Sequence, residues 1–144
     1  AQMYSRLLAL GGGVNYIQGI FIDSQLSPFM LILLMAFIWL ILGMLIDSIS
    51  IILLTVPIFA PLAVSMGYDP VAFAIFGILI IEAGLLSPPF GLLVYTVRGS
   101  VPDPTATLKK IFIGSAPYFI LILVAAFLVL AFPILATLLP KSII

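Results

Sequence analysis

The sequence contains no cysteine and no histidine, and it has only five basic and five acidic residues among 144. The absence of both residue types excludes a disulfide framework, a thiol nucleophile, a Cys/His zinc site and a Ser-His dyad. The formal net charge of zero provides no basic surface of the kind that binds nucleic acid. The sequence therefore argues against a disulfide-stabilised fold, thiol or Ser-His catalysis, a Cys/His zinc protein and a nucleic-acid-binding protein.

Apolar residues make up 65% of the chain and charged residues 7%. Soluble domains are about half apolar and about a quarter charged, so this composition indicates a chain that folds in lipid. We expect an all-α polytopic integral membrane protein. The sequence opens on Ala1 without a signal peptide, and we interpret it as a piece of a longer polypeptide.

The first clear membrane-spanning segment covers residues 28–46. Ser27 and Pro28 are typical of an N-cap followed by proline at the first helical position, and no charge occurs before Asp47. At about 1.5 Å per residue, the segment crosses most of a hydrocarbon core of about 30 Å. Residues 1–26 are more polar, and we expect there a helix packed against protein, broken near three consecutive glycines.

Residues 48–66 carry no charge but contain Thr55, Pro57 and Pro61. An interior proline costs a helix about 3 kcal/mol, because it removes a hydrogen bond and clashes with the preceding turn. Two interpretations are open. The segment is either one kinked span, since membrane helices tolerate proline, or a re-entrant hairpin of two half-helices with its tip at Thr55, Val56 and Pro57. Physics alone favours the kinked span.

Residues 71–97 form a long apolar segment that is interrupted by Ser87, Pro88 and Pro89. Both prolines lack an N–H, and Pro88 forces Ser87 toward an extended conformation. We predict a helix over residues 71–83, an unwound stretch over residues 84–89 and a second half-helix from Phe90. Carbonyls exposed by such a break must be buried in protein or face water, and they suit a sodium ion; a simple kink capped by a hydroxyl is the alternative.

Glu82 is the one charged residue between residues 71 and 97. An acidic side chain at this depth costs roughly 2.5 to 3.5 kcal/mol unless it is protonated, paired or hydrated. It is therefore either a functional carboxylate or a structural one that is hydrogen-bonded to a neighbouring helix.

The remaining charges favour one orientation. Arg98, Lys109 and Lys110 occur in one connection, so the positive-inside rule predicts that residues 98–110 are cytoplasmic. Within it, residues 104–113 resemble a short amphipathic helix in the membrane interface. A last span covers residues 116–139, with a kink at Pro133. If residues 48–66 form one full span, Asp47 lies on the side opposite Asp69.

Three motifs now resemble a known family. They are "GMLID" at residues 43–47, "TVPIFAPLAVSMGYDP" at residues 55–70 and "EAGLLSPPFGLLVY" at residues 82–95. In this order and spacing they resemble the C-terminal portion of the large membrane subunit, or DctM-like permease, of tripartite ATP-independent periplasmic (TRAP) transporters. The resemblance covers about residues 27–140.

The resemblance implies the second half of an inverted-repeat, elevator-type transporter with a re-entrant hairpin and a discontinuous helix, so that residues 48–66 are expected to be the hairpin. It implies sodium-coupled import of an organic anion, such as a C4-dicarboxylate or a sialic acid. The implied partners are a periplasmic binding protein and a small membrane subunit. The implied location is the bacterial or archaeal cytoplasmic (inner) membrane, with no cofactor besides the coupling sodium ion.

The matched positions imply a sodium site formed largely by backbone carbonyls and two hydroxyls. Its expected residues are Thr55, Val56, Pro57, Gly84, Leu85, Leu86, Ser87, Pro88 and Gly91. Thr55, Ser87 and Pro89 are expected to lie next to the substrate, and Asp47 and Glu82 are structural or coupling carboxylates. We predict no catalytic residue and no enzyme. The alternatives are a membrane scaffold subunit or, less favoured, an intramembrane aspartyl-type hydrolase.

Overall fold

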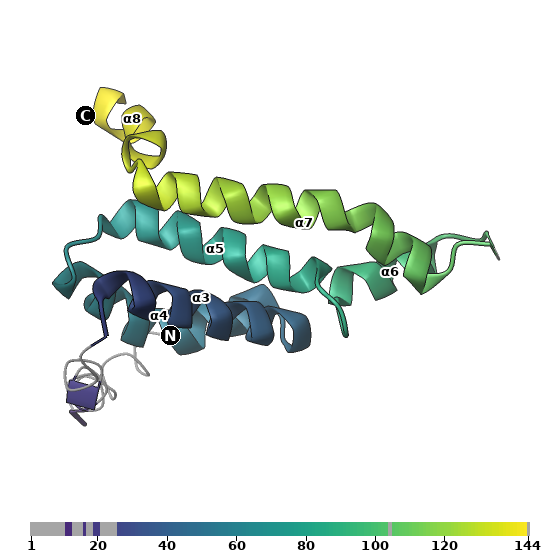
Figure 1. Cartoon of the computed structure of the whole chain (residues 1–144), viewed down its shortest axis with the longest axis horizontal. Helices are drawn as coiled ribbons and strands as arrows, with labels where there is room; N and C mark the ends of the chain where they lie inside the picture. The colour runs from purple at the N-terminus through teal and green to yellow at the C-terminus, as the bar shows by residue number, and fades with distance from the viewer. Residues whose placement is uncertain (1–10, 13–15, 17–18, 21–25, 104, 144) are drawn as a thin grey trace.

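The computed structural model describes residues 11–12, 16, 19–20, 26–103 and 105–143 (Figure 1), and every structural statement below refers to these residues. The described residues form helices joined by short loops, and none of them forms a strand. Its helices are α3 (Pro28–Leu45), α4 (Ser48–Ser65), α5 (Pro70–Leu86), α6 (Leu92–Ser100), α7 (Leu108–Ala131) and α8 (Ile134–Ile143). The helix expected within residues 1–26 falls mostly outside the described residues.

Three of these helices, α3, α4 and α7, are long and apolar enough to cross a membrane, and α5 is a shorter apolar helix. This confirms an all-helical polytopic membrane protein. The start of α3 is as predicted, since the Ser27 hydroxyl accepts a hydrogen bond from the Met30 amide and Pro28 occupies the first turn. The helix ends at Leu45, one residue before the predicted boundary.

The prediction of a re-entrant hairpin over residues 48–66 is wrong in this structure. α4 is one uninterrupted helix, with Thr55, Pro57 and Pro61 in its interior. Each proline removes only the one hydrogen bond that its N–H would have made, whereas a hairpin tip would leave several backbone groups open. The kinked-span interpretation is therefore the better description of the segment. As that interpretation requires, Asp47 and Asp69 cap the starts of two successive helices, α4 and α5, and so lie at opposite ends of α4.

The break in residues 71–97 is confirmed, but its position differs. α5 continues through Gly84 and Leu85 and ends at Leu86, and α6 begins at Leu92 rather than at Phe90. A proline restricts the residue before it but not the residues further back, so the helix persists until Ser87. The unwound stretch is therefore shorter than predicted and lies closer to the two prolines.

The interfacial helix predicted over residues 104–113 is also wrong as a separate element. α7 begins at Leu108, capped by the Thr107 hydroxyl, and runs without interruption to Ala131. Asp103 instead closes a local turn, because its carboxylate accepts hydrogen bonds from the amide and hydroxyl of Thr105. The last span thus starts earlier than residue 116. It ends next to Pro133, after which α8 begins as a separate helix.

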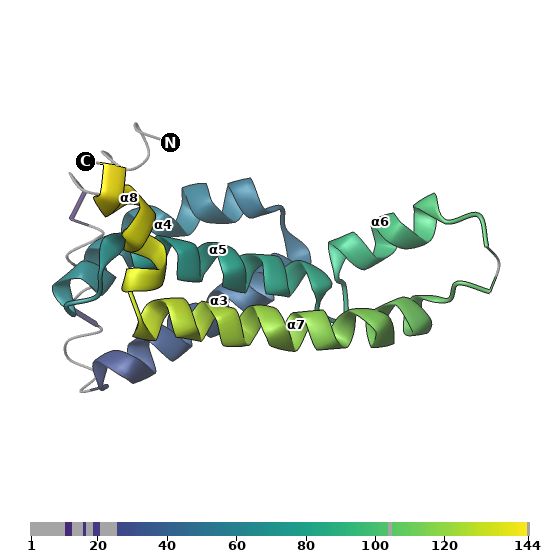
Figure 2. The same ribbon diagram turned by 90° about the horizontal axis from the view of Figure 1, so that it is seen from above.

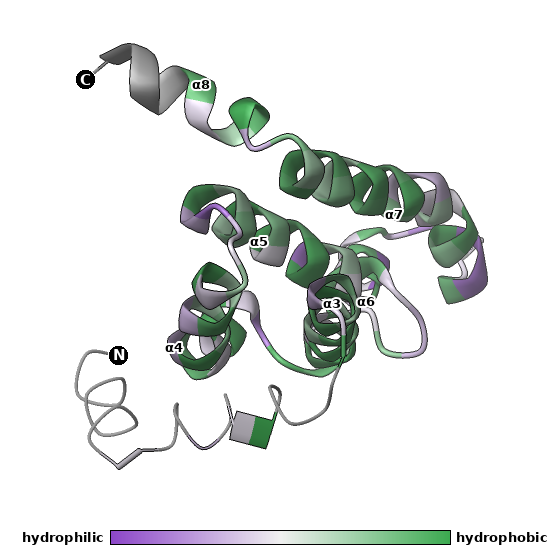
Figure 3. Ribbon diagram, turned by 60° about the vertical axis from the view of Figure 1, so that its left-hand side comes forward, coloured by the Kyte–Doolittle hydropathy of each residue, from purple (hydrophilic) through white to green (hydrophobic). Residues whose placement is uncertain are grey.

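α5 lies at the centre of the bundle, between α3 and α4 on one side and α7 on the other (Figures 1 and 2). α6 continues beyond the end of α5 and lies beside the first part of α7. Hydrophobic residues also cover the outward faces of the helices (Figure 3), as expected where lipid replaces water. The largest fully buried side chains are Trp39, Phe76, Ile32, Met35, Ile51, Ile80, Ile81 and Val94.

Candidate functional site

The interruption between α5 and α6 is the most irregular backbone of the membrane-spanning part. Ser87 is extended, with φ −88° and ψ 138°, as its position before proline requires. The Pro88–Pro89 bond is cis, and Gly91 has a left-handed φ of +36° before α6 begins. The sequence therefore specifies the break locally, through two residues that cannot continue a helix and one that can reverse the backbone.

Two carbonyls at the end of α5 have no backbone donor. A helical carbonyl pairs with the N–H four residues ahead, which is absent at Pro89 for the Leu85 carbonyl. The Leu86 carbonyl would pair with Phe90, but the structure forms no such bond. The Ser87 amide turns back to the Gly84 carbonyl at 3.0 Å. The break thus leaves the Leu85 and Leu86 carbonyls without a backbone donor at the negative end of the α5 dipole.

The Ser87 hydroxyl follows these carbonyls directly in the chain and contacts the carbonyl of Pro88. Ser87 is only 6% exposed, and its Oγ donates a long hydrogen bond of 3.3 Å to the Pro88 carbonyl. The hydroxyl lone pairs remain open to a cation or another donor. Four of the predicted residues are consecutive here: Leu85 and Leu86 end α5, and Ser87 and Pro88 begin the break.

Gly91, at the end of the break, contacts α7. A Cβ at Gly91 would lie 2.8 Å from Cε1 of Phe112, so the aromatic ring occupies the space that a larger residue would need. Phe112 is the fifth residue of α7, a helix of 24 residues. The break therefore lies nearer the start of α7 than its middle.

The structure does not bring Thr55, Val56 and Pro57 to the break. Thr55 is 6% exposed, and its Oγ1 accepts a hydrogen bond of 2.7 Å from the indole Nε1 of Trp39 while donating to the Ile51 carbonyl at 2.8 Å. Trp39 in turn packs against Gly77 of α5.

Gly77 precedes Ser87 by ten residues, or about 15 Å along a helix. The sequence predicted one site that combined residues near Thr55 with residues near Ser87. In the structure these two groups of residues lie apart. The physical reason is the continuity of α4, which holds Thr55 in the middle of a helix and satisfies its hydroxyl within the bundle.

Glu82 lies on the last part of α5 and is half-buried. Its Oε1 accepts a hydrogen bond of 2.9 Å from the hydroxyl of Ser48, the first residue of α4. This is the structural role that the sequence left open for Glu82, with a partner that the sequence did not identify. A serine at the start of a helix is common as a local capping residue, so no pattern in the sequence pointed to this contact.

Asp47 caps α4, because its Oδ1 accepts a hydrogen bond of 3.0 Å from the Ser50 amide. Hydrogen bonding by Ser50, through its hydroxyl and then its backbone amide, holds the pKa of the exposed Asp47 carboxyl below its ordinary value. In the described chain this carboxylate serves as the helix cap that the sequence offered as one of its two roles.

Two glycines bring α3 and α5 into close contact. A Cβ at Gly43 would lie 2.6 Å from the Ile81 carbonyl oxygen, and a Cβ at Gly84 would lie 2.8 Å from the Gly43 Cα. Small residues that allow backbones to approach are a common basis of helix packing in lipid. Gly84 was predicted to belong to the unwound site, but here it is a helical packing residue.

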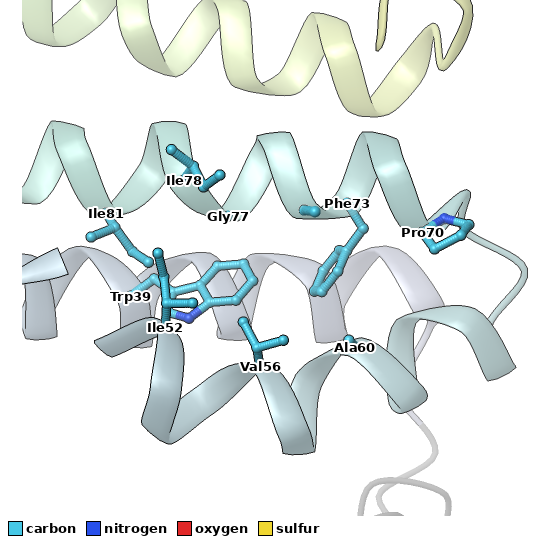
Figure 4. A pocket seen from close by; sticks show the side chains of 10 residues that line it. Trp39, Ile52, Val56, Ala60, Pro70, Phe73, Gly77, Ile78 and Ile81 are labelled. Carbon is cyan, nitrogen blue, oxygen red and sulfur yellow. The ribbon is translucent and has the colours of Figure 1, made fainter. Parts of the chain in front are cut away.

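An apolar groove of about 200 Å³ runs between α4 and α5, with the Trp39 indole of α3 lying between the two helices (Figure 4). Val56 is the one predicted site residue that lines it. No lining residue carries a charge, so the groove offers no clamp for a carboxylate. Its lining residues are Trp39, Ile52, Val56, Ala60, Pro70, Phe73, Ala74, Gly77, Ile78 and Ile81.

These observations define a polytopic helical membrane protein whose central helix is interrupted to expose carbonyl oxygens. Interrupted helices of this kind are typical of secondary transporters, where half-helix ends bind ions and substrates. In the described part of the chain, no group of three or more His, Cys, Asp or Glu residues lies together as a metal site.

The chain belongs to the family described as "Tripartite ATP-independent periplasmic transporter, DctM component", whose sequence profile matches residues 1–135. This confirms the resemblance seen in the three motifs. The chain has no significant match among solved structures.

Curated relatives agree with this family. The chain is 35% identical over 121 residues to the sialic acid TRAP transporter large permease protein SiaM of Vibrio cholerae, covering 84% of this chain and 28% of that protein. It is 32% identical over 120 residues to the C4-dicarboxylate TRAP transporter large permease protein DctM of Pseudomonas aeruginosa, covering 83% of this chain and 27% of that protein.

A third relative, the ectoine TRAP transporter large permease protein TeaC of Halomonas elongata, is 33% identical over 93 residues, or 65% of this chain and 21% of that protein. The chain thus spans less than a third of the length of these relatives. All three are named as transporter permeases, which confirms the prediction that the chain is not an enzyme.

Proposed function

We propose that this chain is part of the large permease subunit of a sodium-coupled TRAP transporter that imports an organic anion. The observation that carries the proposal is the end of α5, where the carbonyls of Leu85 and Leu86 have no backbone donor and the next residue, Ser87, adds a buried hydroxyl. Oxygen ligands at a helix C-terminus suit a hard monovalent cation, because the helix dipole adds negative potential.

In this proposal Leu85, Leu86 and Ser87 hold the sodium ion directly. Pro88 and Pro89 keep the carbonyls open, because neither proline has an N–H to donate. Gly91 allows the backbone to turn into α6, and Phe112 closes the turn from the side of α7. Thr55 belongs to the helix packing rather than to this site, because its hydroxyl already donates to Ile51 and accepts from Trp39.

The substrate class rests on the relatives. Their names refer to sialic acid, C4-dicarboxylate and ectoine, which share a carboxylate group, and the proposal extends to a small carboxylate-bearing solute. Among the described residues, the one hydrogen bond recorded for a basic side chain joins Arg98 to the Val101 carbonyl rather than to the break, so the carboxylate clamp is expected in other parts of the transporter. The proposed partners are a periplasmic binding protein and a small membrane subunit, and the proposed location is the bacterial inner membrane.

The test is uptake into proteoliposomes that contain the complete permease subunit, its small subunit and its binding protein. Uptake is expected to stop when the sodium gradient is collapsed or the binding protein is omitted. Ser87→Ala is expected to raise the sodium concentration for half-maximal uptake by roughly tenfold, since a ligand to a charged group is removed. Uptake that is indifferent to the sodium gradient would overturn the proposal.

Ser65→Ala is the matched control. Ser65 also donates its hydroxyl to a backbone carbonyl, that of Leu62, but it lies at the far end of α4. Its substitution is expected to leave sodium dependence unchanged. Thermal unfolding of the chain in sodium and in potassium gives a second readout, and equal melting temperatures in the two salts would favour a scaffold subunit over an ion-binding one.

A further inference from the structure

Three basic residues lie together at one end of the molecule. Arg98 is in the last turn of α6, and Lys109 and Lys110 are in the first turn of α7. We call these three residues the basic end. Both lysines are exposed and Arg98 is half-buried, with its Nη1 donating to the Val101 carbonyl at 3.4 Å. The positive charges therefore gather where the two helices are joined.

The acidic residue in the same connection does not neutralise the basic end by a hydrogen bond that the structure records. The Asp103 carboxylate accepts hydrogen bonds from the Thr105 amide at 2.7 Å and from the Thr105 hydroxyl at 2.9 Å. Counting these four charges, residues 98–110 carry three positive charges and one negative charge, a net charge of +2. The connection is thus a cationic surface in a chain whose net charge is zero.

The length of α7 sets the depth of this surface. The helix carries no charge from residue 111 to residue 131. At a rise of about 1.5 Å per residue, a helical stretch of this length matches the thickness of a hydrocarbon core of about 30 Å. A chain that spans the membrane with this stretch places Lys109 and Lys110 at the level of the lipid headgroups on one side.

Apolar and aromatic side chains surround the basic end on the same two helices. Tyr95 and Val97 of α6 are 48% and 45% exposed, and Ile113 of α7 is 63% exposed. A tyrosine beside cationic residues is typical of the membrane interface, where a ring contacts acyl chains and a hydroxyl contacts headgroups. Figure 2 shows α6 and the start of α7 extending past the ends of α3 and α4, so α3 and α4 do not cover the basic end.

The geometry points to a binding surface for anionic phospholipid headgroups at the basic end. The phosphate groups would contact Arg98, Lys109 and Lys110, while the acyl chains would lie against the exposed apolar side chains of α6 and α7. Lipid is the occupant favoured over an acidic protein because charge, apolar exposure and membrane depth coincide at this one place. This lipid surface is independent of the sodium site.

The test measures lipid preference in bilayers. The whole chain is reconstituted in phosphatidylcholine that contains a trace of spin-labelled phosphatidylglycerol or spin-labelled phosphatidylcholine, and electron spin resonance gives the relative association of each lipid. The wild-type chain is expected to prefer phosphatidylglycerol by about fivefold or more, since each basic residue near an anionic lipid contributes about that factor. Arg98→Gln/Lys109→Gln/Lys110→Gln is expected to lose the preference.

Two controls sharpen the result. Lys109→Arg/Lys110→Arg retains the charge and is expected to keep the preference. Lys141→Gln removes a basic residue from α8, at the other end of α7, and is expected to have no effect. Should the triple variant fail to fold, raising sodium chloride from about 0.05 M to about 0.5 M must reduce the preference of the wild-type chain, because salt screens headgroup attraction.

Equal association of the two lipids with the wild-type chain would overturn the proposal, as would an unchanged preference in a folded triple variant or in high salt. Loss of binding to an acidic protein subunit in the triple variant, without any lipid preference in the wild type, would assign the basic end to a protein partner instead.

Discussion

The indole Nε1 of Trp39 donates a hydrogen bond of 2.7 Å to the hydroxyl of Thr55, and this bond joins α3 to α4 in the interior of the bundle. The Trp39 ring also lies 5.3 Å from the rings of Phe59 and Phe73, measured between centroids. One side chain of α3 therefore contacts both α4 and α5. A buried indole needs a partner for its N–H, and Thr55 is that partner.

Replacing Thr55 by valine is expected to destabilise the bundle by about 1 to 3 kcal/mol, because the Trp39 N–H would be left buried without an acceptor. Thr55→Ser keeps the hydroxyl and is the matched control. Unfolding in mixed micelles, followed by far-ultraviolet circular dichroism, gives the free energies. If Trp39 and Thr55 interact directly, the Trp39→Phe/Thr55→Val double variant loses less free energy of unfolding than the two single variants together. A loss equal to or greater than that sum would contradict the direct interaction.

Gly84→Ala is expected to separate α3 from α5. The new Cβ would lie 2.7 Å from the Leu40 carbonyl oxygen, and backbone atoms cannot yield as a flexible side chain can. Overpacking of this kind costs about 1 to 3 kcal/mol.

Gly114→Ala is the control for this substitution, because apart from the neighbouring residues and the backbone of its own helical turns no atom lies within 4 Å of the position of its Cβ. Alanine is the better helix former by about 1 kcal/mol, so the control is expected to be neutral or stabilising. Thermal unfolding of both variants checks the difference, and similar melting temperatures would refute the close contact of α3 with α5.

Ser48→Ala is expected to loosen the start of α4 from the end of α5, because Glu82 would lose its hydroxyl donor. A hydrogen bond of this kind contributes about 1 kcal/mol to stability, and this one is partly buried. Glu82→Gln keeps an acceptor oxygen for the Ser48 hydroxyl, so it is expected to destabilise this contact less than Glu82→Leu. Hydrogen exchange at the first turn of α4 measures the loosening directly, and unchanged exchange in Ser48→Ala would argue against the link.

The Asp47 cap predicts an acid-sensitive stability. Ser50 lowers the pKa of Asp47 in the folded state below its ordinary value of 3.8, so the folded state binds its proton less readily than the unfolded state. The contribution of Asp47 is therefore present above that ordinary value and is lost as the pH falls through the lowered pKa.

Asp47→Asn retains a capping oxygen but cannot titrate. Its melting temperature is expected to fall less than that of the wild type between about pH 5 and about pH 2. Asp103, whose pKa Thr105 lowers through its amide and then its hydroxyl, contributes to the slope that remains. Parallel pH profiles for the wild type and Asp47→Asn would exclude a role for Asp47.

The sequence predicted those parts of the fold that local chemistry decides. Pro88 and Pro89 lack N–H groups in any surroundings, so the break followed from the sequence alone. The prolines of α4 act singly, each followed by residues that can restore the helix, and their effect depends on the neighbouring helices. For that reason the prolines of α4 alone favoured a kinked span, and the wrong expectation of a hairpin came from the family resemblance.

The contacts of the site residues required the tertiary structure. The sequence singled out Glu82 and Thr55 but could not identify Ser48 and Trp39 as their partners, since 34 and 16 residues separate the two members of each pair. The presence of one tryptophan in an apolar helix was a usable signal, because its N–H needs an acceptor. Nothing in the sequence around Phe112 indicated that its ring would lie against Gly91.

The contact between Gly43 and Gly84 reverses a familiar rule about substitutions. In a water-soluble protein the damaging change is usually the removal of a large buried side chain, because water drives that side chain inward. Lipid supplies no such drive, and these two helices adhere through the closeness of their backbones. Along this contact the addition of a single methyl group is the damaging change, so glycine is the residue that fits at both positions where α3 meets α5.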